Sequence, residues 1–137
     1  MAMLKTGGWA IAGLLLCAGA AMAGTPPALY TAQQAAAGEA IYAQDCVMCH
    51  GAGMQGQAGP ALIGQGFASP GSDSTIAGVF SVIAQQMPAS APGSLTHAQD
   101  EDAMAYILKQ NGYPAGTTPL DFKSSMTSTA PLVSQVK

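Results

Sequence analysis

Charged residues are scarce in this chain, and arginine is absent. Asp, Glu, Lys and Arg together make up 8% of the 137 residues, and the formal net charge is −3. Nucleic-acid binding depends on basic patches that neutralise phosphate groups, so this composition argues against a nucleic-acid partner. With so few charges, we also expect electrostatic steering toward a protein partner to be weak.

Cysteine is scarce as well, and one of the three cysteines lies near the start of the chain. Residues 1–23 contain Lys5, an apolar run over residues 9–18 and a final Ala-Met-Ala before Gly24. This order is typical of a signal peptide that is cleaved on export, so we expect a periplasmic protein. An uncleaved anchor is the alternative, but the apolar run is short for spanning a bilayer.

Removal of this leader would leave one domain with two cysteines. Cys46 and Cys49 would be the remaining cysteines, and no structural disulfide is then expected, although the periplasm would permit one. We expect residues 24–114 to form the folded domain. Residues 115–137 are expected to form a tail that packs in part and frays after about Ser124. Membrane contact should be peripheral at most.

Both remaining cysteines belong to the motif CVMCH, residues 46–50. Two cysteines separated by two residues and followed directly by histidine are the attachment pattern of a c-type haem. In such a site the thiols of Cys46 and Cys49 bond to the two vinyl groups. The imidazole of His50 then becomes an axial ligand of the iron. We therefore predict one covalently bound haem c.

Three other sites could use the same residues. A redox dithiol is typical of an adjacent βαβ pattern, whereas the flanks here are Ala-rich. A zinc site could combine the CVMCH side chains with His97, but tetrahedral zinc sites usually contain a second closely spaced pair of ligands. A disulfide between Cys46 and Cys49 would be strained across so short a gap. The sequence favours haem over each of these.

Apolar periodicity and helix-stop signals predict an all-α fold with three main helices around the cofactor. They are expected over residues 31–45, over residues 72–87 and from Thr96 to about Lys109. The second should end at Met87 because the following proline cannot continue a helix.

Local capping signals support these helices. Thr31 and Thr96 are each followed three residues later by glutamine, which fits a capping box. In the middle of the first helix, Gly38 lowers helix stability and therefore predicts the close approach of another helix. The expected caps of the second helix are Ser72, Asp73 or Ser74.

The second axial ligand is expected to be Met87. An electron carrier needs an iron that is closed on both faces, and a methionine thioether raises its reduction potential. Met87 precedes a proline-locked loop and lies far enough along the chain to cross the haem. His97 is the main rival, because a site with two histidines would also be closed. The remaining methionines are placed less well for this role, namely Met48, Met54, Met104 and Met126.

The whole chain after the leader resembles the class I cytochromes c. The resemblance depends on residues 46–50, on residues 59–62 (GPAL), on residues 87–88 (MP) and on residues 105–107 (AYI). It implies a cytochrome c-like domain with one haem. One departure is that Trp9 is lost with the leader, so the tryptophan that binds a haem propionate in mitochondrial-type members is missing.

The same resemblance implies roles for residues outside the CVMCH motif. The carbonyl of Pro60 is expected to accept a hydrogen bond from the imidazole of His50 and so fix its ring. Leu62 belongs to the same short motif and is expected beside the haem. Gly38 is expected to cross the last helix near Tyr106.

A narrower resemblance concerns the partners. Residues 87–95 and 106–116 are similar to small periplasmic cytochromes encoded with quinoprotein (PQQ) alcohol or sugar dehydrogenases. This implies a quinoprotein dehydrogenase as electron donor and a terminal oxidase or another cytochrome as acceptor. We therefore expect a single-electron carrier that is not itself an enzyme. A haem subunit of a dehydrogenase complex and an open-site haem sensor or enzyme are the alternatives.

Overall fold

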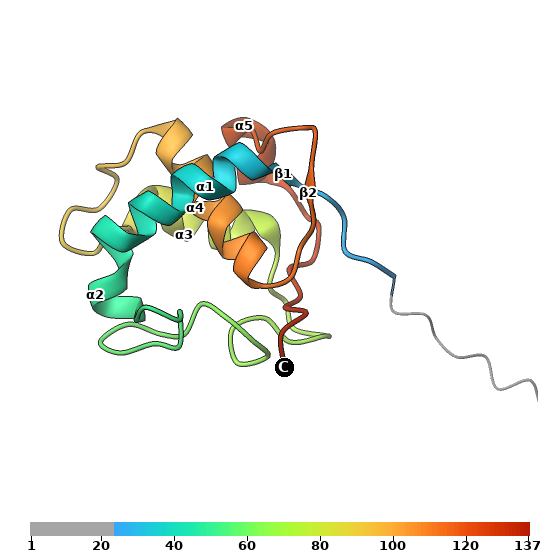
Figure 1. Cartoon of the computed structure of the whole chain (residues 1–137), viewed down its shortest axis with the longest axis horizontal. Helices are drawn as coiled ribbons and strands as arrows, with labels where there is room; N and C mark the ends of the chain where they lie inside the picture. Colours follow the sequence, from blue (N-terminus) through green and yellow to red (C-terminus); the bar gives the residue numbers. More distant parts are fainter. Residues whose placement is uncertain (1–23) are drawn as a thin grey trace, which may run out of the picture.

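The computed structural model describes residues 24–137 (Figure 1). The expected signal peptide, residues 1–23, lies outside the described residues. None of the helices within residues 24–137 is long and apolar enough to cross a membrane.

Helices dominate the described chain, and the expectation of an all-α fold is confirmed. Two very short strands, β1 (Tyr30–Thr31) and β2 (Ala115–Gly116), pair in parallel. The α-helices are α1 (Ala32–Ile41), α2 (Val47–His50), α3 (Ile76–Gln86), α4 (His97–Gln110) and α5 (Phe122–Thr127), and a π-helical turn, η1 (Tyr42–Cys46), joins α1 to α2. Three of these, α1 with its π-helical extension, α3 and α4, are the main helices that the sequence predicted.

Helices α1 and α4 cross at Gly38, as expected (Figure 1). A Cβ at this position would lie 2.9 Å from the Cβ of Tyr106 and would overlap the carbonyl oxygen of Asp102. One turn further along, the rings of Tyr42 and Tyr106 meet with their centroids 5.5 Å apart. The glycine therefore permits the backbone contact that places the end of α1, and with it the CVMCH motif.

The first and third main helices begin where the sequence predicted. The hydroxyls of Thr31 and Thr96 accept hydrogen bonds from the backbone N–H groups of Gln34 and Gln99, and both capping boxes are complete. The second main helix begins later than expected, because its N-cap is Thr75.

The correction at α3 has a long-range cause. The carbonyl of Ser74 accepts a hydrogen bond from the N–H of Leu132 at 2.9 Å, and Thr75 forms a β-bridge with Pro131. This pairing keeps the chain extended through Thr75, which has φ −121° and ψ 161°. None of Ser72, Asp73 and Ser74 is therefore the cap.

The C-terminal segment is ordered beyond Ser124, so the expected fraying is also corrected. Helix α5 continues to Thr127, and its N-cap is Asp121. Further on, Leu132 is fully buried and Ser134 is buried to 2% exposure. The segment packs because its backbone bonds to the start of α3 and because Leu132 joins the core.

Candidate haem site

One cavity of about 890 Å³ collects every site residue that the sequence predicted. This volume lies within the range of about 300–1,000 Å³ typical of ligand pockets. Residues from the CVMCH motif, the following loop, α3, the loop after α3, and α4 contribute to its wall. The predicted residues in its lining are Cys46, Cys49, His50, Pro60, Leu62 and Met87. Their positions are therefore established, while their roles toward haem stay predictions.

The CVMCH motif is presented to the cavity by a short, tightly wound segment. The π-helical turn ends at Cys46, and α2 carries Cys49 and His50; all three residues belong to the cavity lining. The C-cap residue of α2 is Gly51, whose φ of 82° suits glycine. The hydroxyl of Tyr42 donates to the carbonyl of Gly51 at 2.7 Å, which anchors the end of the motif to the core.

Cys46 and Cys49 form no disulfide, and Cys46 is poorly suited to redox exchange. Burial, together with the smaller effects of the neighbouring Asp45 and Cys49, raises the pKa of Cys46 to about 11. Reactive dithiols instead have a lowered thiol pKa, because the thiolate is the nucleophile. The environment of Cys46 therefore disfavours the dithiol alternative.

His50 is held in one orientation by the loop that follows it. Its Nδ1 lies 2.8 Å from the carbonyl oxygen of Pro60. Because a carbonyl can only accept a hydrogen bond, this contact requires the proton on Nδ1 and leaves Nε2 free to bind a metal. Gly59 packs against the imidazole, and a Cβ there would lie 3.0 Å from Cε1 of His50.

Met87 reaches the cavity from the end of α3. It is the C-cap residue, with an extended backbone at φ −114° and ψ 154°, and its N–H donates to the carbonyl of Ile83. Its own carbonyl accepts from the N–H of Gly93 at 3.3 Å, which closes the loop after α3. The thioether is thus carried by backbone that is fixed on both sides.

The rival ligands lie elsewhere or are exposed. Met54 and Met104 are buried in the core outside the cavity lining, and Met126 packs against the core. Met48 is 80% exposed. The ring of His97 stacks on Phe122 with centroids 3.6 Å apart and is also outside the lining. Within residues 24–137, no group of three or more His, Cys, Asp and Glu side chains could hold a metal ion.

The remaining wall of the cavity is mainly apolar. Asp45 is the only charged residue in the lining formed by the described chain. An apolar wall around thiols, an imidazole and a thioether fits a large, mostly apolar ligand such as haem. Several of these wall residues were not predicted as site residues, although Val79 and Ile83 belong to the apolar periodicity that predicted the second main helix. The unpredicted site residues are Phe67, Val79, Val82, Ile83, Leu95 and Ile107.

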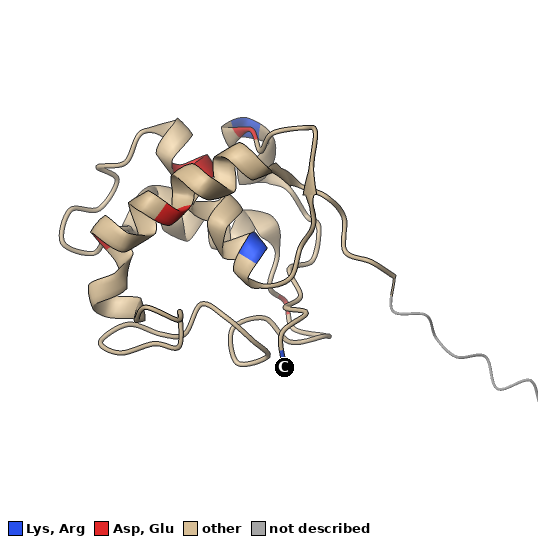
Figure 2. Ribbon diagram, in the orientation of Figure 1, with Lys and Arg blue, Asp and Glu red and all other residues tan. Residues whose placement is uncertain are grey.

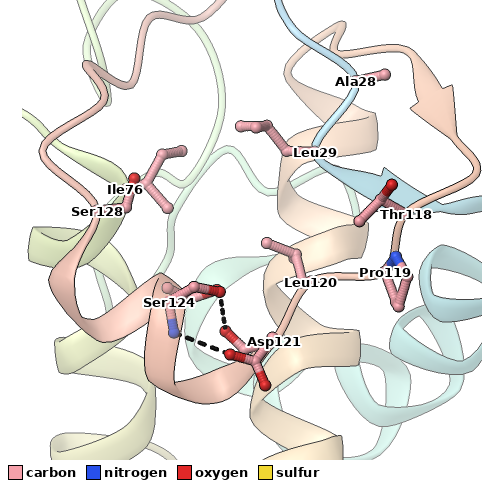
Figure 3. Close-up of a pocket in the computed structure, with 10 residues that line it drawn as sticks. Ala28, Leu29, Ile76, Thr118, Pro119, Leu120, Asp121, Ser124 and Ser128 are labelled. Atoms are coloured by element: carbon pink, nitrogen blue, oxygen red, sulfur yellow. Dashed lines mark hydrogen bonds between the residues drawn. The ribbon is translucent and has the colours of Figure 1, made fainter.

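A second hollow of about 260 Å³ contains none of the predicted site residues (Figure 3). Leu29, Ile76 and Leu120 form its apolar part. At its edge, Oδ1 of Asp121 accepts from the backbone N–H of Ser124 at 3.0 Å, which caps α5. This hollow therefore lies between the C-terminal segment and the start of α3, where the contacts stabilise the fold.

Comparison with known proteins agrees with the fold. Residues 33–107, more than half of the chain, match the family model described as cytochrome c oxidase, cbb3-type, subunit III. Among solved structures, the sulfane dehydrogenase SoxCD from Paracoccus pantotrophus matches with 21% identity and a TM-score of 0.55. The match covers 67% of this chain and 50% of the solved one, so this chain spans about half of that length. At this identity the match shows a common fold. No curated protein matches.

Proposed function

Because the chain belongs to the cytochrome c family, in the group described as cytochrome c oxidase, cbb3-type, subunit III, we propose that it is an exported monohaem carrier of single electrons. Family membership implies electron transfer with haem c. The number of haems, their covalent attachment and the periplasmic location are part of the proposal. The observation that carries it is the single cavity lined by both thiols, the imidazole of His50 and the thioether of Met87.

Different residues of the cavity would hold different parts of the haem. The thiols of Cys46 and Cys49 would each add sulfur and hydrogen across one vinyl double bond, which consumes no oxidant. His50 would bind the iron through Nε2, because Nδ1 already donates to Pro60. Met87 would supply a second ligand to the iron through its thioether. Haem c, when bound, supplies an iron that accepts and releases one electron.

The wall of the cavity would set the conditions for this exchange. Apolar side chains such as Leu62 and Phe67 exclude water, and burial of the iron is one of the factors that tune its potential. Donation from His50 to the Pro60 carbonyl makes the imidazole a stronger ligand and keeps its orientation. With both His50 and Met87 as ligands, the haem would supply electron transfer without oxygen binding, as an electron carrier requires.

The central test is the visible spectrum and intact mass of the full chain expressed with export. We expect a Soret band and the mass of one covalently attached haem on a chain that begins near Gly24. A chain without attached haem would overturn the proposal. A mass that retains residues 1–23 would overturn only the cleaved leader.

The axial ligand is tested by Met87→Leu. We expect loss of the weak near-infrared band of the oxidised protein and new binding of CO by the reduced protein. Met104→Leu is the matched control, because Met104 is a fully buried core residue outside the cavity. CO binding by the unmodified protein, without displacement of a ligand, would instead support an open-site sensor or enzyme.

The mouth of the cavity is a suitable contact surface for partners. Met48 and Val82, the two exposed large apolar side chains of the described chain, both belong to its lining. Asp73 is the only Asp, Glu, Lys or Arg between residues 46 and 99, and Figure 2 shows that the loops on both sides of α3 carry almost no charge. We propose that small, transient complexes form here, as is common for redox encounters.

An apolar contact surface has a measurable consequence. Electron transfer with a quinoprotein dehydrogenase, our proposed donor, should change little with ionic strength, because surface charges contribute little to the encounter. Met48→Glu should slow the reaction, whereas Lys123→Glu on α5 should not. A rate that falls steeply with added salt would contradict the apolar surface. Stable co-purification with the dehydrogenase would favour a fixed haem subunit over a diffusing carrier.

A further inference from the structure

Asn111 joins the loop after His50 to the end of α4. Its side chain is fully buried. The Nδ2 group donates to the carbonyls of Leu62 at 2.8 Å and Ile107 at 2.9 Å. Its Oδ1 accepts from the N–H of Gly64 at 3.2 Å. Both donors of the amide are therefore used, one on the loop and one on α4. Through the Leu62 carbonyl and the Gly64 N–H, the amide ties two points of the loop to a helix that packs on α1.

The C-terminal segment fastens the same loop through Ser134, which is also buried. The hydroxyl of Ser134 shares the N–H of Gly64 at 3.2 Å, and its own N–H donates to the carbonyl of Ala68 at 2.8 Å. The side chain of Gln65 donates to the carbonyl of Ser134 at 2.8 Å. In Figure 1 the C-terminal end descends to this loop, in agreement with these contacts.

These contacts lie directly beside the residue that orients the imidazole. Leu62 follows Pro60 by two positions, and the Pro60 carbonyl is the acceptor for Nδ1 of His50 at 2.8 Å. On the other side of Pro60, the N–H of Gly59 donates to the carbonyl of Cys49 at 2.8 Å. The Pro60 carbonyl thus lies between two fixed points, one in the CVMCH motif and one at Asn111.

We propose that Asn111 and Ser134 are positioning residues for His50. By holding Leu62 and Gly64 they keep the Pro60 carbonyl against Nδ1, and so control how strongly the imidazole binds iron. This inference depends on the proposed function, in which His50 is an axial ligand. A weaker hydrogen bond makes the imidazole less basic, which stabilises the oxidised iron less and raises the reduction potential.

The test compares Asn111→Ala and Ser134→Ala with Ser125→Ala in the exported, haem-loaded full chain. Ser125 is a serine buried to a similar degree on α5, and it makes none of the loop contacts. We expect the ring N–H of His50 to exchange with solvent about tenfold faster in Asn111→Ala, because a lost buried hydrogen bond favours local opening. The effect should be smaller in Ser134→Ala. The reduction potential should rise in both and stay unchanged in Ser125→Ala.

A loss of stability alone does not distinguish a positioning role of Asn111 and Ser134 from a purely structural role. The exchange rate of the His50 ring N–H and the reduction potential make this distinction. If Asn111→Ala and Ser134→Ala both lose stability but keep the wild-type exchange rate and reduction potential, the two residues are structural only and the inference is overturned. If Asn111→Ala does not fold, Ser134→Ala decides by the same two readouts. A wild-type protein without haem or without His50 ligation would instead overturn the proposed function.

Discussion

Gly38 on α1 and Tyr106 on α4 face each other without room for one more carbon atom. A Cβ on Gly38 would lie 2.9 Å from that of Tyr106 and would overlap the backbone carbonyl of Asp102. A helix backbone cannot move aside as the end of a flexible side chain can. The crossing that places the CVMCH motif therefore depends on glycine.

Gly38→Ala should lower the free energy of unfolding by about 1–3 kcal/mol, the usual cost of overpacking. Helix propensity alone predicts the opposite, a gain of up to about 1 kcal/mol. Urea unfolding of the haem-loaded protein measures the difference. Ala37→Gly, at an exposed position of the same helix, is the control and should lose up to about 1 kcal/mol from propensity alone. A more stable Gly38→Ala variant would show that the helices can separate at little cost.

The features predicted correctly from the sequence have short-range causes. A capping box is complete within four residues, so Thr31 and Thr96 could be identified directly. The CVMCH motif is equally local, and the structure places it in the same cavity as Met87. Gly38 predicted the helix crossing because a glycine inside a helix lowers helix stability and usually has a packing role.

The errors have long-range causes. The extended conformation that delays α3 until after Thr75 depends on Pro131 and Leu132, which are more than fifty positions away in the chain. The same pairing orders the tail that was expected to fray after Ser124. The hydrogen bonds of Asn111 to Leu62 and Gly64 join residues more than forty positions apart in the chain, so no local pattern predicts them.

The corrected cap of α3 gives a direct prediction. Thr75→Ala should reduce the free energy of unfolding by about 0.5–2 kcal/mol, because the N–H of Gly78 loses the hydroxyl that accepts its hydrogen bond at 3.0 Å. Ser72→Ala, at a position first considered for the cap, should have almost no effect. Thermal unfolding of the two variants under the same conditions measures both. A larger loss of stability for Ser72→Ala than for Thr75→Ala would show that Ser72 is the N-cap of α3.

Asp100 is a buried carboxyl group in the first turn of α4. It is 2% exposed, and its Oδ1 has no hydrogen-bond partner within the described residues. Burial raises the pKa of Asp100 from its ordinary value of 3.8 to about 6; nearby His97 lowers the pKa and Glu101 raises it. The folded state therefore binds this proton more tightly than the unfolded state does.

The sign of the pH dependence follows from this difference. Between about pH 4 and pH 6 the folded state holds more protons at Asp100, so its stability falls as the pH rises through this window and stays lower above it. Asp100→Asn has no charge to bury at any pH. It should be more stable than the wild type at pH 7, by an amount on the order of 1 kcal/mol, and the gain should disappear near pH 4.

Urea unfolding between about pH 4 and pH 7 measures this difference in stability. Asp121→Asn is the control, because its effect on stability should have the opposite sign. The backbone and side chain of Ser124 donate hydrogen bonds to Asp121 and hold its pKa below the ordinary value. Its contribution to stability is therefore present at neutral pH and lost as the pH falls. The Asn variant should then be less stable than the wild type at pH 7, with a difference that shrinks in acid. If Asp100→Asn kept the pH profile of the wild type, the buried carboxyl would not be the titrating group.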